Sequence, residues 1–229
     1  VVWEEGQTFS DLDRSPQAAA REARFELLCN WCHAHGVSRL LFAHHADDQA
    51  ETFLGRLIRG SGIDGLASMS PVSDRNGIAI LRPLLSRYKA DLVATCEYFE
   101  QPWLNDPSNH NERYTRVRLR KLMASLGEEG LSPDRLLNTV THMQRAKEAI
   151  DSAVDLVMCQ AVSESKAEVG ALSVDIAALL DVPDEIGLRS LARCLCQVSG
   201  SSYTPRFDSL VVILEHIKAG SWSDRTLHG

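Results

Sequence analysis

Residues 38–58 have the sequence SRLLFAHHADDQAETFLGRLI, in which an apolar run passes directly into a helical pattern. The run 38–45 shows no alternation of apolar and polar residues, which is typical of a strand buried on both faces. Further along, apolar side chains recur at helical spacing and form one stripe that is expected to face a sheet: Ala50, Phe53, Leu54, Leu57 and Ile58. The stretch therefore predicts a strand followed at once by a helix.

The flanking segments repeat this alternation of helix and strand. Residues 15–36 begin with Ser-Pro, a helix N-cap and first-turn proline, and end at a glycine, so a helix is expected between them. Residues 77–85 (GIAILRPLL) predict a second strand, and residues 86–100 a further helix. Short connections between alternating helices and strands predict an α/β fold with a partial, doubly wound parallel sheet.

The second half of the chain has a different character. From about Tyr114 the strand signals fade and the remaining segments have helical periodicity. Gly127 and Gly130 bracket two glutamates at the point where the pattern changes. We therefore expect two domains, an α/β domain over residues 1–126 and a mostly helical domain over residues 127–229.

Composition limits the class of protein. The 229 residues are 44% hydrophobic with a formal net charge of -7, as in ordinary globular proteins. No apolar run approaches the roughly 18 residues of a membrane span, and the first residues lack the pattern of a signal peptide. We expect a cytoplasmic protein with no membrane partner, in which the cysteines are reduced.

Two cysteines and a histidine lie close together in the first predicted helix. Cys29, Cys32 and His33 match the C-x-x-C-H signature of covalent haem attachment. The pattern lies inside an amphipathic helix, and no second Cys or His pair completes a four-ligand zinc site. We interpret these side chains as structural and expect no protein-held metal.

The helix at residues 46–58 carries the strongest candidate site. At about 100° per residue, Asp48, Glu51 and Gly55 cluster opposite the apolar stripe, so two carboxylates would share an acidic recess at the helix N-terminus. Asp47 lies near the edge of the stripe, where it is expected only to complement the helix dipole. Because His44 and His45 are adjacent at a strand end, at most one of them can join the acids.

Two further stretches are candidate ligand contacts. The segment Arg59-Gly60-Ser61-Gly62 ends this helix, so Gly60 is either a helix C-cap or part of a loop that lets a ligand approach the backbone. Beyond the turn at residues 106–109, five cations occur within nine residues: Arg113, Arg116, Arg118, Arg120 and Lys121. They could form a solvated helix face, but few acids neutralise them, which favours a phosphate-binding patch.

These stretches together resemble the tRNA(Ile)-lysidine synthase family of PP-loop ATP pyrophosphatases. The resemblance rests on QAAAREARF (17–25), AHHADDQAETFLGRLIRGSGIDGLASM (43–69), LRPLL (81–85) and W-x-x-DPSN (103–109), and more weakly on PRFDSL (205–210) and TLHG (226–229). The SGGxDS phosphate loop of the family does not occur in this sequence. Because the chain begins at Val1 rather than Met, we expect a trimmed, inactive piece of an enzyme rather than an inactive relative.

The resemblance implies an adenine-nucleotide alpha-hydrolase-like fold and a two-step reaction. ATP would adenylate the wobble cytidine of a tRNA(Ile) with a CAU anticodon, and free L-lysine would then displace AMP to give lysidine. Mg²⁺ would accompany the ATP phosphates, and a homodimer is left open.

The resemblance also implies roles for single residues. Arg24 would reach the ATP phosphates, Asp48 and Glu51 would bind the lysine ammonium, and Asp48 would help to deprotonate it. A nucleotide or substrate loop would include His45, Arg59, Gly60, Ser61 and Gly62. The tRNA would contact Arg82, Asn109, Arg113, Arg116 and Arg118.

Two other functions are compatible with the same sequence features. Another PP-loop tRNA-modifying enzyme, of the thiolase type, would need reactive thiols close to its loops. A non-catalytic RNA-binding relative would keep the fold without the phosphate loop. Lysine incorporation into tRNA and the reactivity of Cys29 and Cys32 separate these alternatives.

Overall fold

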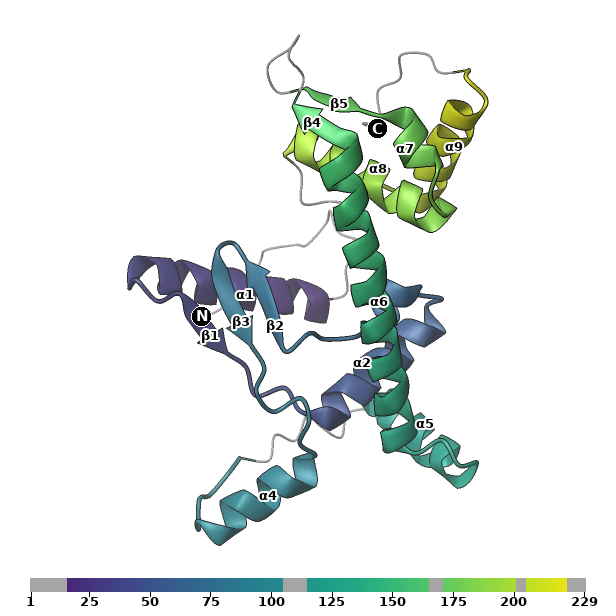
Figure 1. Cartoon of the computed structure of the whole chain (residues 1–229). Helices are drawn as coiled ribbons and strands as arrows, with labels where there is room; N and C mark the ends of the chain where they lie inside the picture. Colours follow the sequence, from purple (N-terminus) through teal and green to yellow (C-terminus); the bar gives the residue numbers. More distant parts are fainter. Residues whose placement is uncertain (1–15, 105–114, 165–170, 201–204, 222–229) are drawn as a thin grey trace. The chain divides into compact units, whose positions relative to one another are not determined.

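The computed structural model describes residues 16–104, 115–164, 171–200 and 205–221 (Figure 1). Its contacts divide the chain into two compact units, Val1–Thr141 and His142–Gly229. Within the described ranges, no helix is both long and apolar enough to cross a membrane.

The first unit contains a three-stranded sheet in the order β1-β3-β2. Strand β1 (Arg39–Leu41) pairs in parallel with β3 (Ile78–Leu81), with Leu40 opposite Ile80, so the expected parallel pairing is confirmed. Helix α1 (Pro16–Ala34) covers one face of this sheet (Figure 1). The core between them consists of Phe25, Cys29, Cys32, Ile78 and Ile80.

The prediction that the first strand is buried on both faces is wrong. Leu40 and Phe42 pack against the core under α1, but the side chain of Leu41 is 65% exposed. β1 is an edge of the described sheet, and α1 covers only the face to which Leu40 and Phe42 contribute. The unbroken apolar run therefore does not correspond to two buried faces in the described part of the chain.

A strand that the sequence analysis missed, β2 (Val72–Arg75), pairs antiparallel with β3. Asn76 and Gly77 connect the two strands with φ values of 53° and 76°. Two successive positive φ angles are those of a type I′ hairpin turn, which Asn-Gly favours. The described sheet is therefore mixed: its central strand β3 pairs in parallel with β1 on one side and antiparallel with β2 on the other.

Between β1 and β2 the chain forms α2 (Ala46–Ile58) and α3 (Ile63–Leu66), and after β3 it forms α4 (Lys89–Tyr98) and α5 (Thr115–Glu128). In α2 the expected stripe is only partly buried. Phe53 and Leu54 are each 4% exposed, whereas Leu57 and Ile58 are 48% and 61% exposed. The last turn of α2 therefore extends beyond the core.

Helix α6 (Pro133–Ala161) runs from the first unit into the second, which also contains α7 (Ile176–Leu180), α8 (Asp184–Ser199) and α9 (Phe207–Lys218). The expected helical character is confirmed. An antiparallel hairpin of β4 (Val162–Glu164) and β5 (Leu172–Val174) was not expected. Leucine, valine and isoleucine side chains from α6, α7 and α8 form the core of this unit: Val154, Val157, Leu179 and Ile186, together with Ala161.

Candidate functional site

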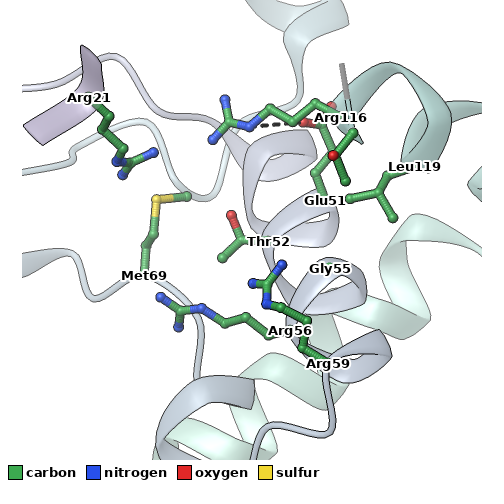
Figure 2. A pocket seen from close by; sticks show the side chains of 10 residues that line it. Arg21, Glu51, Thr52, Gly55, Arg56, Arg59, Met69, Arg116 and Leu119 are labelled. Atoms are coloured by element: carbon green, nitrogen blue, oxygen red, sulfur yellow. Dashed lines mark ion pairs between the residues drawn. The ribbon is translucent and has the colours of Figure 1, made fainter. Parts of the chain in front are cut away.

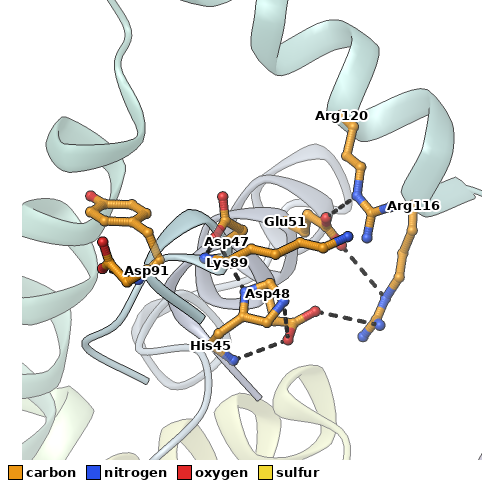
Figure 3. A network of polar contacts seen from close by, with 9 residues as sticks. His45, Asp47, Asp48, Glu51, Lys89, Asp91, Arg116 and Arg120 are labelled. Carbon is orange, nitrogen blue, oxygen red and sulfur yellow. Dashed lines mark hydrogen bonds and ion pairs between the residues drawn. The ribbon is translucent and has the colours of Figure 1, made fainter. Parts of the chain in front are cut away.

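The N-terminus of α2 lies at the carboxyl end of β1, where parallel sheets commonly place ligands. The backbone N–H of His45 donates to Asp48 Oδ2 over 3.1 Å, so Asp48 closes the first turn of its own helix. The ring of His45 lies beside both aspartates, with Nδ1 3.2 Å from Asp47 Oδ2 and Nε2 3.5 Å from Asp48 Oδ2 (Figure 3). His45 is therefore the histidine that joins the acids.

Asp47 does more than complement the helix dipole. Its Oδ2 accepts a hydrogen bond of 2.8 Å from the backbone N–H of Lys89, the first residue of α4. This contact joins the N-termini of α2 and α4. The expectation that Asp47 only complements the helix dipole is therefore corrected. Its partner Lys89 lies 42 residues away in sequence, so the hydrogen bond is a tertiary contact.

Asp48 and Glu51, which we call the acidic pair, share a buried face of α2, at 8% and 2% exposure. Arginines of α5 cover them (Figure 3): Arg116 Nη1 lies 3.9 Å from Asp48 Oδ1, and Arg116 Nε lies 3.9 Å from Glu51 Oε2. Arg120 donates to Glu51 Oε1. The acidic recess predicted from sequence is therefore present but closed by guanidinium groups.

Gly55 explains how α5 can pack so close to α2. A Cβ atom at this position would lie 3.2 Å from Leu119 Cδ1, a tighter distance than side chains usually tolerate. Leu119 is 8% exposed against α2, and Arg116 and Arg120 flank it one turn of helix apart. The absence of a side chain at Gly55 thus lets α5 present its arginines to the acidic pair.

His44 is a site residue whose position the sequence did not reveal. Its ring stacks on Phe42 at 5.5 Å between centroids, and its Nδ1 is buried without a hydrogen-bond partner in the described structure. Burial lowers the pKa of His44, partly opposed by the negative charge of Asp48 and reinforced by neighbouring arginines such as Arg21. Burial therefore favours the neutral form of this imidazole, which lies near the acidic pair.

A cavity of about 330 Å³ opens next to Glu51 (Figure 2). We call it the arginine cavity, because four arginines contribute to its wall: Arg21, Arg56, Arg59 and Arg116. Glu51, Thr52, Gly55, Met69, Thr115 and Leu119 complete the lining. Arg21 and Arg56 were missed by the sequence analysis, which selected Arg24; that side chain is exposed and does not line the cavity.

The glycine loop after α2 has a structural explanation. Gly60 has φ +70°, its N–H donates to Leu57 O over 2.9 Å, and the N–H of Ser61 donates to Arg56 O over 3.1 Å. These are the two bonds of a Schellman helix cap, which favours glycine. Of the two interpretations left open, the C-cap therefore accounts for Gly60, while Gly62 has open space around it.

Arg82 does not line the arginine cavity. It is only 9% exposed, and its Nη1 donates to Ser70 O and Ser73 Oγ over 2.9 and 3.0 Å. Burial lowers the pKa of Arg82, and the positive charge of Arg21 lowers it further. Its position indicates a role in holding the 70–73 segment.

The remaining predicted tRNA contacts have different positions. Arg118 is exposed on α5 and donates to Thr115 Oγ1 over 3.1 Å. Arg116 is partly exposed but faces the acidic pair. Asn109 and Arg113 lie outside the described residues.

Among the residues described, no group of three or more His, Cys, Asp and Glu side chains could hold a metal ion. Cys29 and Cys32 are 1% and 0% exposed in the core beneath α1, as the structural interpretation of the C-x-x-C-H pattern predicts.

Most of the first unit matches the model of a known protein family. Residues 4–126 match the family model of the PP-loop domain, which is more than half of the chain. The protein therefore belongs to the PP-loop domain family, and the matched region includes α2, the acidic pair and the arginine cavity.

Among curated proteins, the chain is similar to tRNA(Ile)-lysidine synthases. It is 37% identical over 201 residues to that of Wolbachia sp. subsp. Brugia malayi, covering 88% of this chain and 46% of the relative. It is 40% identical over 217 residues to that of Bradyrhizobium sp. (strain BTAi1), covering 92% of this chain and 59% of the relative. The chain thus spans about half the length of the curated relatives it matches.

Proposed function

We propose that the protein acts in ATP-dependent formation of lysidine on a tRNA(Ile) with a CAU anticodon. One observation carries this proposal: a buried pair of carboxylates, Asp48 and Glu51, lies directly beside a cavity rich in arginine. Carboxylates suit the lysine ammonium, and guanidinium groups suit phosphates and RNA. The relatives named tRNA(Ile)-lysidine synthase support the assignment.

The proposed reaction has two steps. In the first, O2 of the cytidine attacks the α-phosphorus of ATP, the new O–P bond forms, and the bond to diphosphate breaks. In the second, the lysine side-chain amine attacks C2, a C–N bond forms, the C–O bond to AMP breaks, and the proton of the amine is lost. Mg²⁺ bound to the ATP phosphates would neutralise part of their charge.

The acidic pair would bind and orient the ammonium group of lysine. In the described structure Arg116 and Arg120 supply the positive charge that these carboxylates require. Lysine would take over part of that role, so its binding involves displacement of the Arg116 side chain, which lies 3.9 Å from both acids. Asp48 would then accept the proton that the attacking amine loses.

Other residues would serve the larger substrates. Arg24 is proposed to contact the ATP phosphates from α1, and Arg118, exposed on α5, to contact the tRNA backbone. Arg113 and Asn109 stay proposed tRNA contacts. A cytoplasmic location and the division into domains at residues 126 and 127 also belong to this proposal.

The test is incorporation of labelled lysine into tRNA(Ile) with a CAU anticodon by the full-length protein, in the presence of ATP. Asp48→Asn keeps an oxygen that can accept from His45 N–H but removes the charge, so we expect a folded protein without incorporation. Asp208→Asn, at an exposed first-turn position of α9, is the matched control and should incorporate lysine normally. Incorporation that survives Asp48→Asn would refute the role of Asp48.

The thiolase alternative loses support from the burial of Cys29 and Cys32. A thiol probe applied to the folded protein tests it directly. Rapid modification of either cysteine would revive that alternative.

A further inference from the structure

We propose that Arg120 is a positioning residue for the lysine substrate, because it holds Glu51 so that one carboxylate oxygen, Oε2, is left for the lysine ammonium. This role rests on the function proposed above and deepens it. Arg120 itself would touch no substrate and would act only through Glu51, whose side chain is 1% exposed.

The two carboxylate oxygens of Glu51 have different surroundings. Oε1 accepts a hydrogen bond from Arg120 Nε, whereas Oε2 is buried and has no hydrogen-bond partner among the described residues. Arg116 Nε lies 3.9 Å from Oε2, which is too far for a hydrogen bond. Since a buried oxygen without a donor costs free energy, Oε2 gains more than Oε1 from a cationic donor such as an ammonium group.

The two arginines that face Glu51 are not equivalent. Arg116 lines the arginine cavity and lies 3.9 Å from both acids, whereas Arg120 does not line the cavity and donates to Glu51. Figure 3 shows both side chains extending from α5 toward Glu51, and they belong to successive turns of that helix. Arg120 can therefore stay on Glu51 while a ligand displaces Arg116.

The packing of α5 fixes the point from which Arg120 extends. Its neighbour Leu119 is 8% exposed, and a Cβ atom at Gly55 would lie only 3.2 Å from Leu119 Cδ1. A carboxylate that is already held by such a partner loses little freedom when it binds a ligand. Without Arg120, the carboxylate of Glu51 could turn to Arg116, which would then compete with lysine more strongly.

Lysine incorporation by the full-length protein, measured over a range of lysine concentrations, tests this role. In Arg120→Gln we expect the KM for lysine to rise about tenfold with a smaller change in kcat. The KM values for ATP and tRNA should stay unchanged, which a general loss of structure would not produce. Arg120→Lys keeps the charge and should restore part of the lysine affinity. Arg39→Gln, at an exposed arginine that begins β1 away from the cavity wall, is the matched control and should behave as the wild type.

Two results would overturn the role of Arg120 and leave lysidine formation by the wild type intact: an unchanged KM for lysine in Arg120→Gln, or equal increases in KM for all three substrates. If Arg120→Gln does not fold, Arg120→Lys decides in the same way, with an expected increase in the KM for lysine of about threefold.

Calorimetric titration with L-lysine separates this role from the enzyme assignment. Lysine binding that weakens in Arg120→Gln, in a protein that incorporates no lysine into tRNA, would support the role of Arg120 and count against lysidine formation. Absence of both lysine binding and lysine incorporation in the wild type would overturn both proposals.

Discussion

At the scale of single residues, the acidic pair has to be neutralised because it is buried, yet in the proposed function it also has to be open to a cationic substrate. Glu51 is the more deeply buried of the two, with its side chain 1% exposed, and its Oε2 has no hydrogen-bond partner in the described structure. A buried carboxylate is stable only when cations and donors compensate for its lost hydration. Arg120 and Arg116 provide this compensation, and a cationic substrate would compete for the same oxygens.

Helical periodicity alone was enough to predict that Asp48 and Glu51 share a face, because the two residues belong to one regular helix. The arginines that cover them could not be predicted as partners. Arg120 lies 69 residues from Glu51, and their contact depends on how α5 packs beside Gly55. Residue contacts within one helix can thus be read from sequence, whereas contacts between helices require their packing.

Replacing Glu51 should therefore lower stability as well as function. Glu51→Gln removes the charge that Arg120 and Arg116 face, and we expect a loss of about 2 kcal/mol in the free energy of unfolding. Urea denaturation monitored by circular dichroism measures it. Glu128→Gln, at the exposed end of α5, is the control and should change stability little. Equal stabilities of the two variants would contradict this account of Glu51.

Tyr88 gives a prediction about pH. Its hydroxyl donates to Asp134 Oδ1, and this hydrogen bond, with smaller contributions from burial and nearby acids, raises the pKa of Tyr88 from 10.0 to about 12. Since the neutral phenol is the bonded form, its contribution to stability is complete below pH 10 and is lost as the pH rises toward 12.

Ultraviolet titration of phenolate formation, taken as the difference from Tyr88→Phe, should show the raised pKa. In Asp134→Asn the carboxylate is gone, so the pKa of Tyr88 should fall toward its ordinary value of 10.0. A titration of Tyr88 that does not respond to Asp134→Asn would show that the hydrogen bond is not its cause.

At the scale of elements, short strands were harder to predict than helices. β2 has only four residues, and Ser73 and Asp74 at its centre give it no apolar pattern. The Asn76-Gly77 turn was the available signal. By contrast, the parallel pairing of β1 with β3 followed from two apolar runs separated by a helix, which is a pattern of many residues. Elements with few residues carry too little periodicity to be recognised without their partners.

The short helix α3 depends on one glycine. A Cβ atom at Gly65 would lie 2.5 Å from Ser61 Cβ, so Gly65→Ala forces the loop apart, and we expect a cost of about 2 kcal/mol in unfolding free energy. Ser61→Gly in the same molecule removes the clashing atom and should restore most of it. Gly62→Ala, with φ -74° and no atom within 4 Å, is the control and should be nearly neutral. Absence of rescue by Ser61→Gly would refute the clash.

At the scale of the whole molecule, the position of the domain boundary follows from packing more than from composition. The sequence changes character near Gly127, whereas the contacts divide the chain between Thr141 and His142, inside α6. The first turns of α6 contain two buried side chains, Leu136 and Val140, each 3% exposed. The boundary between cooperative units is set by the local free energy of unfolding, which depends on this packing.

Hydrogen exchange of a core variant distinguishes the two boundaries. Leu179 is 1% exposed in the cluster with Val154 and Ile186, so Leu179→Ala should destabilise the second unit by about 3 kcal/mol. We expect faster amide exchange in α8 and in residues 142–161, while residues 133–141 keep their protection together with α1 and β3. Ile176→Ala, at a side chain that is 43% exposed on the same short helix, is the control and should alter exchange little. Loss of protection along the whole of α6 would instead place the cooperative boundary before residue 133, as the change in sequence character near Gly127 predicts.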